Sequence, residues 1–240
     1  MNLNGKTILL TGGTDGIGRE LAMQLKAKGA EVIVTGRTPE RIAAAKAAGY
    51  EVIAADLSSQ AGVDAVLDAV KGRAIDILIN NAGVGSDHDF REAAPDLADN
   101  DRCIFLNLNA PVHLITHMMD GLKARPEAMI VNTTSGLAIA PRAGGPIYCA
   151  TKAGLRSYTM ALRAQLRDTA IHVLEVLPPV VETKMTARRE GNKLSVKDCA
   201  AQIIDAMETN AKEANVGMVK LLRLVESISP ALARKIMIKF

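Results

Sequence analysis

Tyr148 and Lys152 are two residues whose types and spacing could do chemistry together. They lie four positions apart in YCATK (148–152), so on a helix they share one face, one turn apart. A tyrosine hydroxyl has a pKa of about 10, which makes it a weak acid or base at neutral pH, but a neighbouring ammonium favours the phenolate and lowers that pKa. The spacing therefore allows a proton donor with its charge partner, although many amphipathic helices contain the same spacing by chance.

A third candidate group is the Ser135 hydroxyl, which precedes Tyr148 at the end of another apolar run. A hydroxyl in that place could hold a substrate oxygen and stabilise the charge that develops on it. If the reaction moves a hydride, a cofactor supplies that part of the chemistry. The three side chains thus predict proton transfer at a carbonyl or alcohol, provided that the fold brings them together.

Composition narrows the classes of protein to consider. The chain has 240 residues, 48% apolar and 23% charged, as in ordinary globular proteins. A net charge of only +3 and 2% aromatic residues disfavour nucleic-acid binding. No stretch approaches the roughly 20 apolar residues of a membrane span, and the first apolar run is too short for a secretion signal. The three cysteines form no disulfide or metal pattern, so we expect free thiols and a cytoplasmic protein.

The elements that must position these side chains alternate along the sequence. Short apolar runs typical of strands are separated by Ala- and Leu-rich stretches with helical spacing, which indicates a parallel sheet covered on both faces. Right-handed crossovers make this a Rossmann-like, doubly wound α/β sheet, and we expect a single domain over residues 1–240. The expected strands are Thr7–Thr11, Glu31–Thr35, Glu51–Ala54, Ile75–Ile79, Ala128–Thr133 and Ile171–Val176, and the expected helices include Arg19–Lys28, Pro39–Ala48, Ala61–Val70 and Ile147–Leu166.

The residues after each strand matter most, because ligands of such sheets bind beyond the carboxyl ends of the strands. The first expected strand runs into TGGTDGIG (11–18). A glycine-rich turn lets the backbone approach a pyrophosphate, and the next helix offers free N–H groups and a partial positive charge at its start. The turn therefore predicts a dinucleotide site, with a tight turn that binds nothing as the simpler alternative.

The end of the second strand bears on the choice of cofactor. In dinucleotide-binding folds an acidic side chain here bonds the ribose 2′-hydroxyl of NAD, whereas an arginine accepts the 2′-phosphate of NADP. This chain has Gly36 and Arg37 at that point and no carboxylate. Because arginine pairs with phosphate through two hydrogen bonds, we predict NADP, with NAD as the alternative. Arg37 could also be a solvated side chain beside Glu40.

Later strand ends add further polar groups. Asp56 could accept a hydrogen bond from an adenine amino group, or cap the next helix. NNAG (80–83) suits close backbone contact with a ribose, although asparagines also stiffen turns by bonding nearby backbone. The sixth strand leads into PPVVET (178–183), where two prolines hold the exit loop extended.

Together these motifs resemble the short-chain dehydrogenase/reductase family. The resemblance covers residues 5–185, and its motifs come in the family's order and spacing. The residues that carry it are TGGTDGIG (11–18), DL (56–57), NNAG (80–83), NLNAP (107–111), Ser135, YCATK (148–152) and PPVVET (178–183).

The resemblance implies roles for individual residues. Tyr148 would be the general acid/base, Lys152 would lower its pKa and bind the nicotinamide ribose, and Ser135 would anchor the substrate oxygen. Asn107 matches the family's asparagine that holds a water in a proton relay beyond Lys152. The residues implied in cofactor binding are Gly12, Thr14, Gly16, Ile17, Gly18, Arg37, Asp56, Leu57, Asn81, Ala82, Gly83, Tyr148, Lys152, Pro178, Val181 and Thr183.

The chain also departs from the family pattern at three points. Pro179 stands where the family commonly has glycine, which removes an N–H from the exit loop. Asp15 stands where many NADP-using members have a basic residue, which weakens the case for NADP. The usual last strand is faint, with only Val216–Val219 resembling it.

The C-terminal quarter is the least regular part of the sequence. Residues 184–197 are polar and contain glycine, which favours a substrate lid. Residues 220–240 have helical spacing broken at Pro230, and we expect a helical extension that packs or forms dimer contacts. A basic amphipathic helix on a membrane surface is the alternative. His113 and His117 lack a third partner, so we expect no metal site, and Asp87-His88-Asp89 is interpreted as a solvated loop that could border the active-site mouth.

The sequence thus favours an NADP(H)-dependent oxidoreductase that moves hydride between nicotinamide and a ketone or secondary alcohol. A non-catalytic dinucleotide-binding sensor or scaffold, or an epimerase or dehydratase on the same scaffold, are the alternatives. By the family resemblance, we expect a homodimer or homotetramer paired through the helices that begin at Leu108 and Ile147. We also expect a small carbonyl or alcohol substrate.

Overall fold

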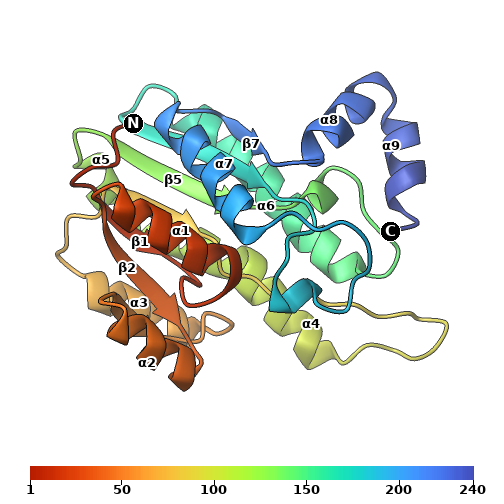
Figure 1. Cartoon of the computed structure of the whole chain (residues 1–240), viewed down its shortest axis with the longest axis horizontal. Coiled ribbons are helices and arrows are strands. Elements are labelled where there is room, and N and C mark those ends of the chain that lie inside the picture. The colour runs from red at the N-terminus through yellow and green to blue at the C-terminus, as the bar shows by residue number, and fades with distance from the viewer.

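The computed structural model describes residues 1–240 and contains one seven-stranded sheet. All strands are parallel and lie in the order β3-β2-β1-β4-β5-β6-β7, with helices on both faces (Figure 1). This confirms the predicted single, doubly wound α/β domain. The strands are β1 (Thr7–Leu10), β2 (Glu31–Gly36), β3 (Glu51–Ala54), β4 (Ile77–Asn80), β5 (Ala128–Thr133), β6 (Ile171–Leu177) and β7 (Glu213–Asn215).

The central strands are mostly apolar because their side chains enter two separate cores. Ile8 and Leu10 of β1 belong to one buried cluster, and Leu9 between them belongs to the other. The first cluster includes side chains of the helices α1 and α7, and the second includes side chains of α3, α5 and α6. A strand covered on both faces gains from an apolar residue at every position, which explains the continuous runs in the sequence.

Most helices begin with residues that favour a helix start. Ser59 and Ser195 cap α3 and α7 by accepting a backbone N–H, and prolines stand in the first turn of α2, α5, α6 and α9. The helices are α1 (Gly16–Ala27), α2 (Pro39–Ala47), α3 (Gln60–Val70), α4 (Leu97–Ile104), α5 (Ala110–Lys123), α6 (Pro146–Gln165), α7 (Val196–Glu208), α8 (Val219–Ile228) and α9 (Pro230–Met237). No helix combines the length and the apolar character needed to span a membrane.

The expected last strand was misplaced. The structure has β7 at Glu213–Asn215, whereas Val216–Val219 forms the turn into α8, with Gly217 at a φ of 53°. Val216 and Val219 are apolar because they are buried in that turn. β7 is a short edge strand of polar residues, so it has no apolar signature of its own.

The C-terminal helices α8 and α9 stand at one end of the molecule, beyond β7 (Figure 1). Only Val219 of α8 and Ala233 of α9 are buried, and Ala143 donates its backbone N–H to the carbonyl of Ile238. The outer side of this hairpin exposes apolar side chains. They are Met218, Leu221, Leu224, Ile228, Leu232, Ile236, Ile238 and Phe240.

Candidate active site

A cavity of about 520 Å³ opens at the carboxyl edge of the sheet, beside the point where strand order reverses from β1 to β4. Every residue that the sequence implied in cofactor binding lines this cavity, and so does Ser135. Asn107 is the one predicted site residue that lies behind the cavity wall. The volume of the cavity is in the range of small-molecule sites.

The glycine-rich turn has the shape that close approach of a ligand requires. Gly12 and Gly13 donate backbone N–H groups to Thr35, at 3.0 Å to its hydroxyl and 3.1 Å to its carbonyl. A Cβ at Gly18 would lie 2.2 Å from the Gly12 carbonyl, so no larger residue fits there. α1 begins at Gly16 and points its N-terminus at the cavity rim, which fits a pyrophosphate on the free N–H groups.

The NNAG turn is tied to the glycine turn by one buried threonine. The Thr11 hydroxyl accepts the backbone N–H groups of Asn81 and Ala82, each at 3.0 Å, and the Asn81 amide donates to the carbonyls of Thr11 and Gly12. Asn80 instead donates to Asn132 on β5. The asparagines therefore stiffen the turn, and the backbone of Ala82 and Gly83 is what faces the cavity. Sequence patterns did not single out Thr11.

Two arginines and two aspartates also line the cavity. Arg37 is 3.3 Å from Asp56, and Arg41, which sequence reasoning missed, is 2.8 Å from Asp15. Burial alone would raise the pKa of Asp56, but hydrogen bonds from Ser58 and the Arg37 charge together hold that pKa below its usual value. In the sequence, Asp15 weakened the case for NADP. In the structure its negative charge is paired with the positive charge of Arg41, which lies in the first turn of α2.

The three candidate catalytic side chains meet on one wall of the cavity. Ser135 follows β5 and caps a short 3₁₀ turn (Gly136–Ala138) by accepting the N–H of Leu137 at 3.1 Å. Tyr148 and Lys152 lie in the first two turns of α6, with the Lys152 Nζ 5.8 Å from the centre of the Tyr148 ring. That Nζ also donates to the carbonyl of Thr133 at 2.8 Å. The end of β5 therefore carries Ser135 and holds Lys152.

Burial sets the protonation state of this pair in the free chain. It raises the pKa of Tyr148, and the neighbouring Ser135 side chain and the Arg189 charge act in the opposite direction. Burial also lowers the pKa of Lys152 to about 8. The phenol is therefore protonated at neutral pH, and the ammonium is held in a place that favours its neutral form.

Asn107 is fully buried in a π-helical turn (Phe105–Asn109) between α4 and α5. Its amide oxygen accepts the N–H of Val84 at 2.9 Å, and its Nδ2 donates to the Val84 carbonyl and to the Thr151 hydroxyl. Asn107 thus joins the segment after NNAG to α6. Thr151, to which the sequence assigned no role, is the contact on α6. Single π-helical turns of this kind often occur at functional sites.

The loop after NNAG is not simply solvated. Asp87 pairs with the buried Arg142, which precedes α6, and lies 3.6 Å from Arg189 in the lid segment. Gly144 and Gly145 leave room for the Arg142 guanidinium, which a Cβ at either would approach to 2.9 Å. Asp87 therefore links three segments while its own side chain stays exposed, so the stretch is a solvated loop, as expected, that is also tied to its neighbours by ion pairs.

The PPVVET segment continues from β6 into the same cavity. Gly136 donates its N–H to the Pro178 carbonyl at 3.1 Å, so β5 and β6 stay paired past their ends. Thr183 lies against Gly16, where a Cβ would come within 3.3 Å of the threonine methyl group, and Met185 and Thr186 in the following 3₁₀ turn also line the cavity. The segment rejoins helix at Val196, which places the last two residues of the expected lid (184–197) in α7.

His113 and His117 both lie on α5, outside the cavity. The His113 ring meets Phe105 edge-on at 5.6 Å, and His117 is exposed. The structure contains no group of three or more His, Cys, Asp or Glu side chains arranged to hold a metal ion.

Comparison with known proteins adds relatives across most of the chain. The family described as "short chain dehydrogenase" matches residues 6–194. An uncharacterized oxidoreductase DltE of Bacillus subtilis is 36% identical over 233 residues, covering 93% of this chain and 92% of that protein. Serine 3-dehydrogenase of Agrobacterium fabrum is 33% identical over 80% of this chain and 78% of its own. The NADP-dependent 3-hydroxy acid dehydrogenase of Schizosaccharomyces pombe is 32% identical with the same coverage.

Solved structures agree with the fold. A short-chain dehydrogenase from Burkholderia cenocepacia J2315, in complex with NADP, superposes with a TM-score of 0.88 over the whole of both chains at 24% identity. The whole-chain agreement includes the C-terminal hairpin, and the family match spans the residues from β1 to the lid segment. The chain is therefore an oxidoreductase of the short-chain dehydrogenase/reductase family.

Proposed function

We propose that the chain is an NADP(H)-dependent oxidoreductase that interconverts a ketone and a secondary alcohol, with Tyr148 as the general acid/base. The observation that carries this proposal is the convergence of Ser135, Tyr148 and Lys152 on one wall of the cavity that the glycine turn also lines. A non-catalytic binding protein has no need for a serine, a tyrosine and a lysine in that arrangement.

Each of the three side chains has a different role in the reaction. A bound nicotinamide would supply the hydride to the carbonyl carbon, or accept it in the reverse direction. During reduction the Tyr148 hydroxyl donates its proton to the carbonyl oxygen, so that hydride and proton together give the alcohol. The Ser135 hydroxyl donates a hydrogen bond to the same oxygen and stabilises its developing charge. The Lys152 ammonium stabilises the phenolate that remains.

The protonation states of the free chain suit the reductive direction. Because burial raises the pKa of Tyr148, the phenol is protonated at neutral pH in the free chain, which is the form that can donate a proton. The substrate class that we propose is a hydroxy or keto acid or a related small carbonyl, supported by the names of the serine and 3-hydroxy acid dehydrogenases among the relatives. The lid segment 184–197, which contributes Met185 and Thr186 to the cavity, is proposed to set the choice within that class.

Turnover with a panel of substrates tests the proposal. NADPH oxidation would be followed with ketones and 3-keto acids, and NADP reduction with serine, 3-hydroxy acids and secondary alcohols. Catalysed change of cofactor absorbance supports an oxidoreductase. Tight NADPH binding without turnover would instead favour the sensor or scaffold. Substrate conversion without net cofactor change would indicate the epimerase or dehydratase.

The preference for NADP rests on Arg37 and can be measured separately. Arg37→Ala is expected to weaken NADPH binding by roughly tenfold or more and to change NADH binding by less than about twofold, because a charge-assisted pair with phosphate is lost. Lys46→Ala is the matched control, since it removes one exposed positive charge from α2 outside the cavity. Equal loss of NADPH and NADH affinity in Arg37→Ala would contradict a role with the 2′-phosphate.

We also propose a homo-oligomer formed through the outer faces of α5 and α6. The outer face of α6 is made of small exposed residues, among them Ala153, Ala161 and Ala164, which allow a second helix to approach closely. Ala161→Arg is therefore expected to shift the mass measured by light scattering toward the monomer, whereas the exposed Ala47→Arg on α2 leaves it unchanged. Identical masses for both variants and the wild type would contradict this interface.

The C-terminal hairpin and the location of the protein are lesser parts of the proposal. We favour protein packing over membrane contact for the exposed apolar side of α8 and α9, and pelleting with anionic lipid vesicles would reveal the alternative. All three cysteines are free and buried, which supports a reducing, cytoplasmic setting.

A further inference from the structure

A fully buried carboxylate lies directly behind the candidate active site. Glu175 on β6 is 0% exposed, and its two oxygens accept hydrogen bonds from the Thr134 hydroxyl at 2.8 Å and from Arg156 at 2.7 Å. Burial raises the pKa of this carboxyl, and the Arg156 charge and the two hydrogen bonds act against that. A carboxylate is rarely kept in such a place unless its partners hold it there.

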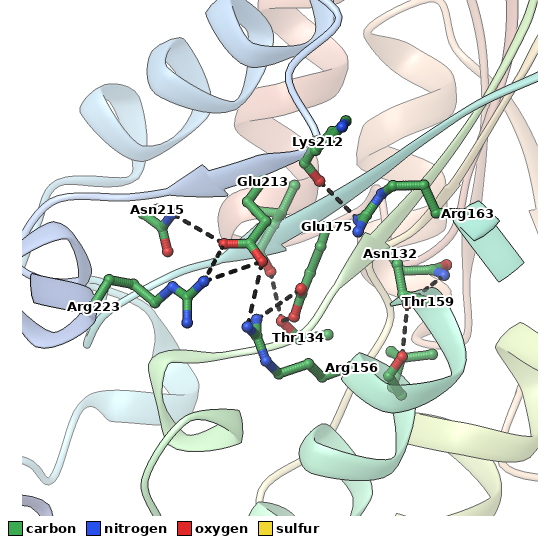
Figure 2. A network of polar contacts seen from close by, with 12 residues as sticks. Asn132, Thr134, Arg156, Thr159, Arg163, Glu175, Lys212, Glu213, Asn215 and Arg223 are labelled. Atoms are coloured by element: carbon green, nitrogen blue, oxygen red, sulfur yellow. Dashed lines mark hydrogen bonds and ion pairs between the residues drawn. The ribbon is translucent and has the colours of Figure 1, made fainter. Parts of the chain in front are cut away.

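Arg156 connects this carboxylate to other elements (Figure 2). It lies on α6, one turn beyond Lys152, and its guanidinium stands between Glu175 and Glu213 of β7, 3.3 Å from the latter. Glu213 in turn pairs with Arg223 of α8 at 3.1 Å. The ion pairs thus run from the inside of the sheet to the C-terminal hairpin, and Arg156 keeps a partner even when Glu175 is replaced.

Thr134 connects the same carboxylate to the catalytic groups. It lies between Thr133, whose carbonyl accepts the Lys152 ammonium, and Ser135. Its backbone N–H donates to the Val176 carbonyl at 2.8 Å, and its hydroxyl lies 3.0 Å from the same carbonyl. One oxygen of Glu175 therefore binds the strand end that carries Ser135. The other oxygen binds the helix that carries Tyr148 and Lys152.

We propose that Glu175 is a positioning residue for the reaction, because it fixes the strand end of Ser135 relative to the helix of Tyr148 and Lys152. The role rests on the proposed oxidoreductase function. Small displacements of reacting groups lower rates strongly, which makes a carboxylate that touches neither substrate nor cofactor important for turnover. No sequence motif includes this residue, although a glutamate inside an otherwise apolar strand is itself an unusual residue.

The test compares two replacements of Glu175. In Glu175→Met the volume is nearly kept and both hydrogen bonds are lost, so kcat is expected to fall on the order of 10-fold to 100-fold with KM values within about twofold. In Glu175→Gln the amide still accepts from Arg156 through its oxygen and donates to the Thr134 hydroxyl, so most of the activity returns. Recovery of activity in Glu175→Gln would show that the two hydrogen bonds of residue 175, and not its negative charge, are needed for turnover.

Thr159→Val provides the matched control. The Thr159 hydroxyl is also fully buried and also joins α6 to β5, by accepting from Asn132 at 2.9 Å, but neither of these side chains hydrogen-bonds to Thr134 or Ser135 (Figure 2). Its loss should lower the melting temperature and leave kcat within about twofold of the wild type. The proposal is overturned if Glu175→Met keeps wild-type kcat, or if Thr159→Val lowers kcat as much as Glu175→Met.

A spectroscopic readout separates this proposal from the proposed function. The chain has three tyrosines and no tryptophan, so in a Tyr50→Phe/Tyr158→Phe background the ultraviolet titration reports Tyr148 alone. Glu175→Met should raise the apparent pKa of Tyr148, because a displaced Ser135 no longer lowers it. If the wild type turns over no carbonyl, the proposed function fails. The positioning role is tested independently of turnover, because an unchanged apparent pKa of Tyr148 in Glu175→Met would overturn it.

Discussion

Replacing Tyr148 with phenylalanine is expected to lower kcat by roughly 10²–10⁴-fold, the usual contribution of a general acid or base. The variant removes one hydroxyl from the cavity wall and keeps the ring that packs beside Lys152. NADPH binding should stay within about twofold of the wild type, because the glycine turn, Arg37 and the NNAG turn are unchanged. Single-turnover measurements with saturating NADPH would show that the loss lies in the chemical step.

Tyr158→Phe is the control for this variant. Tyr158 lies on the same helix, is half-buried, and packs against the apolar core outside the cavity, so loss of its hydroxyl should leave kcat within about twofold. Wild-type turnover in Tyr148→Phe would refute the proposed mechanism and would make the protonated Lys152 the next candidate for the proton donor.

The fold was predictable because its signal is local. Strands covered on both faces are apolar at nearly every position, and the expected β3 and β5 match the structure to the residue. The others differ by one or two residues at their ends, where hydrogen bonding decides the boundary. β7 was misplaced because a three-residue edge strand is held by its neighbour β6 and by ion pairs of Glu213, neither of which leaves an apolar pattern.

Most of the cavity residues were also predictable, since they follow a strand or lie in the first turns of the next helix, and the carboxyl ends of parallel strands share one edge. The supporting contacts were not. Arg41 with Asp15, Asp87 with Arg142, and Glu175 with Arg156 join segments that are far apart in the sequence. No spacing rule relates such partners, because their distances depend on how the whole sheet twists and on where the loops cross. The choice of NADP, the roles of the site residues and the oligomeric state stay predictions.

Lys152→Met is expected to abolish turnover and yet to stabilise the protein at pH 7. Burial lowers the pKa of Lys152 from 10.5 to about 8, so the folded chain binds this proton less tightly than the unfolded chain does. The difference of about 2.5 pH units corresponds to about 3 kcal/mol of lost stability, from which the lost hydrogen bond to the Thr133 carbonyl must be subtracted. A net gain of about 1–2 kcal/mol, or roughly 2–8 °C in melting temperature, is expected for the methionine variant.

The pH dependence of that gain identifies its cause. Below pH 8 both the folded and the unfolded wild type carry the proton, so the full destabilisation is present. Between pH 8 and 10.5 the unfolded chain binds more protons, so the free energy of unfolding of the wild type rises by about 3 kcal/mol, and the gain of Lys152→Met first disappears and then becomes a loss. Lys46→Met, at an exposed position, should show neither effect. A lower melting temperature for Lys152→Met at pH 7 would mean that the Lys152 ammonium stabilises the free fold. With the expected gain, the lysine is retained at a cost to stability, as catalytic groups held ready in a buried site often are.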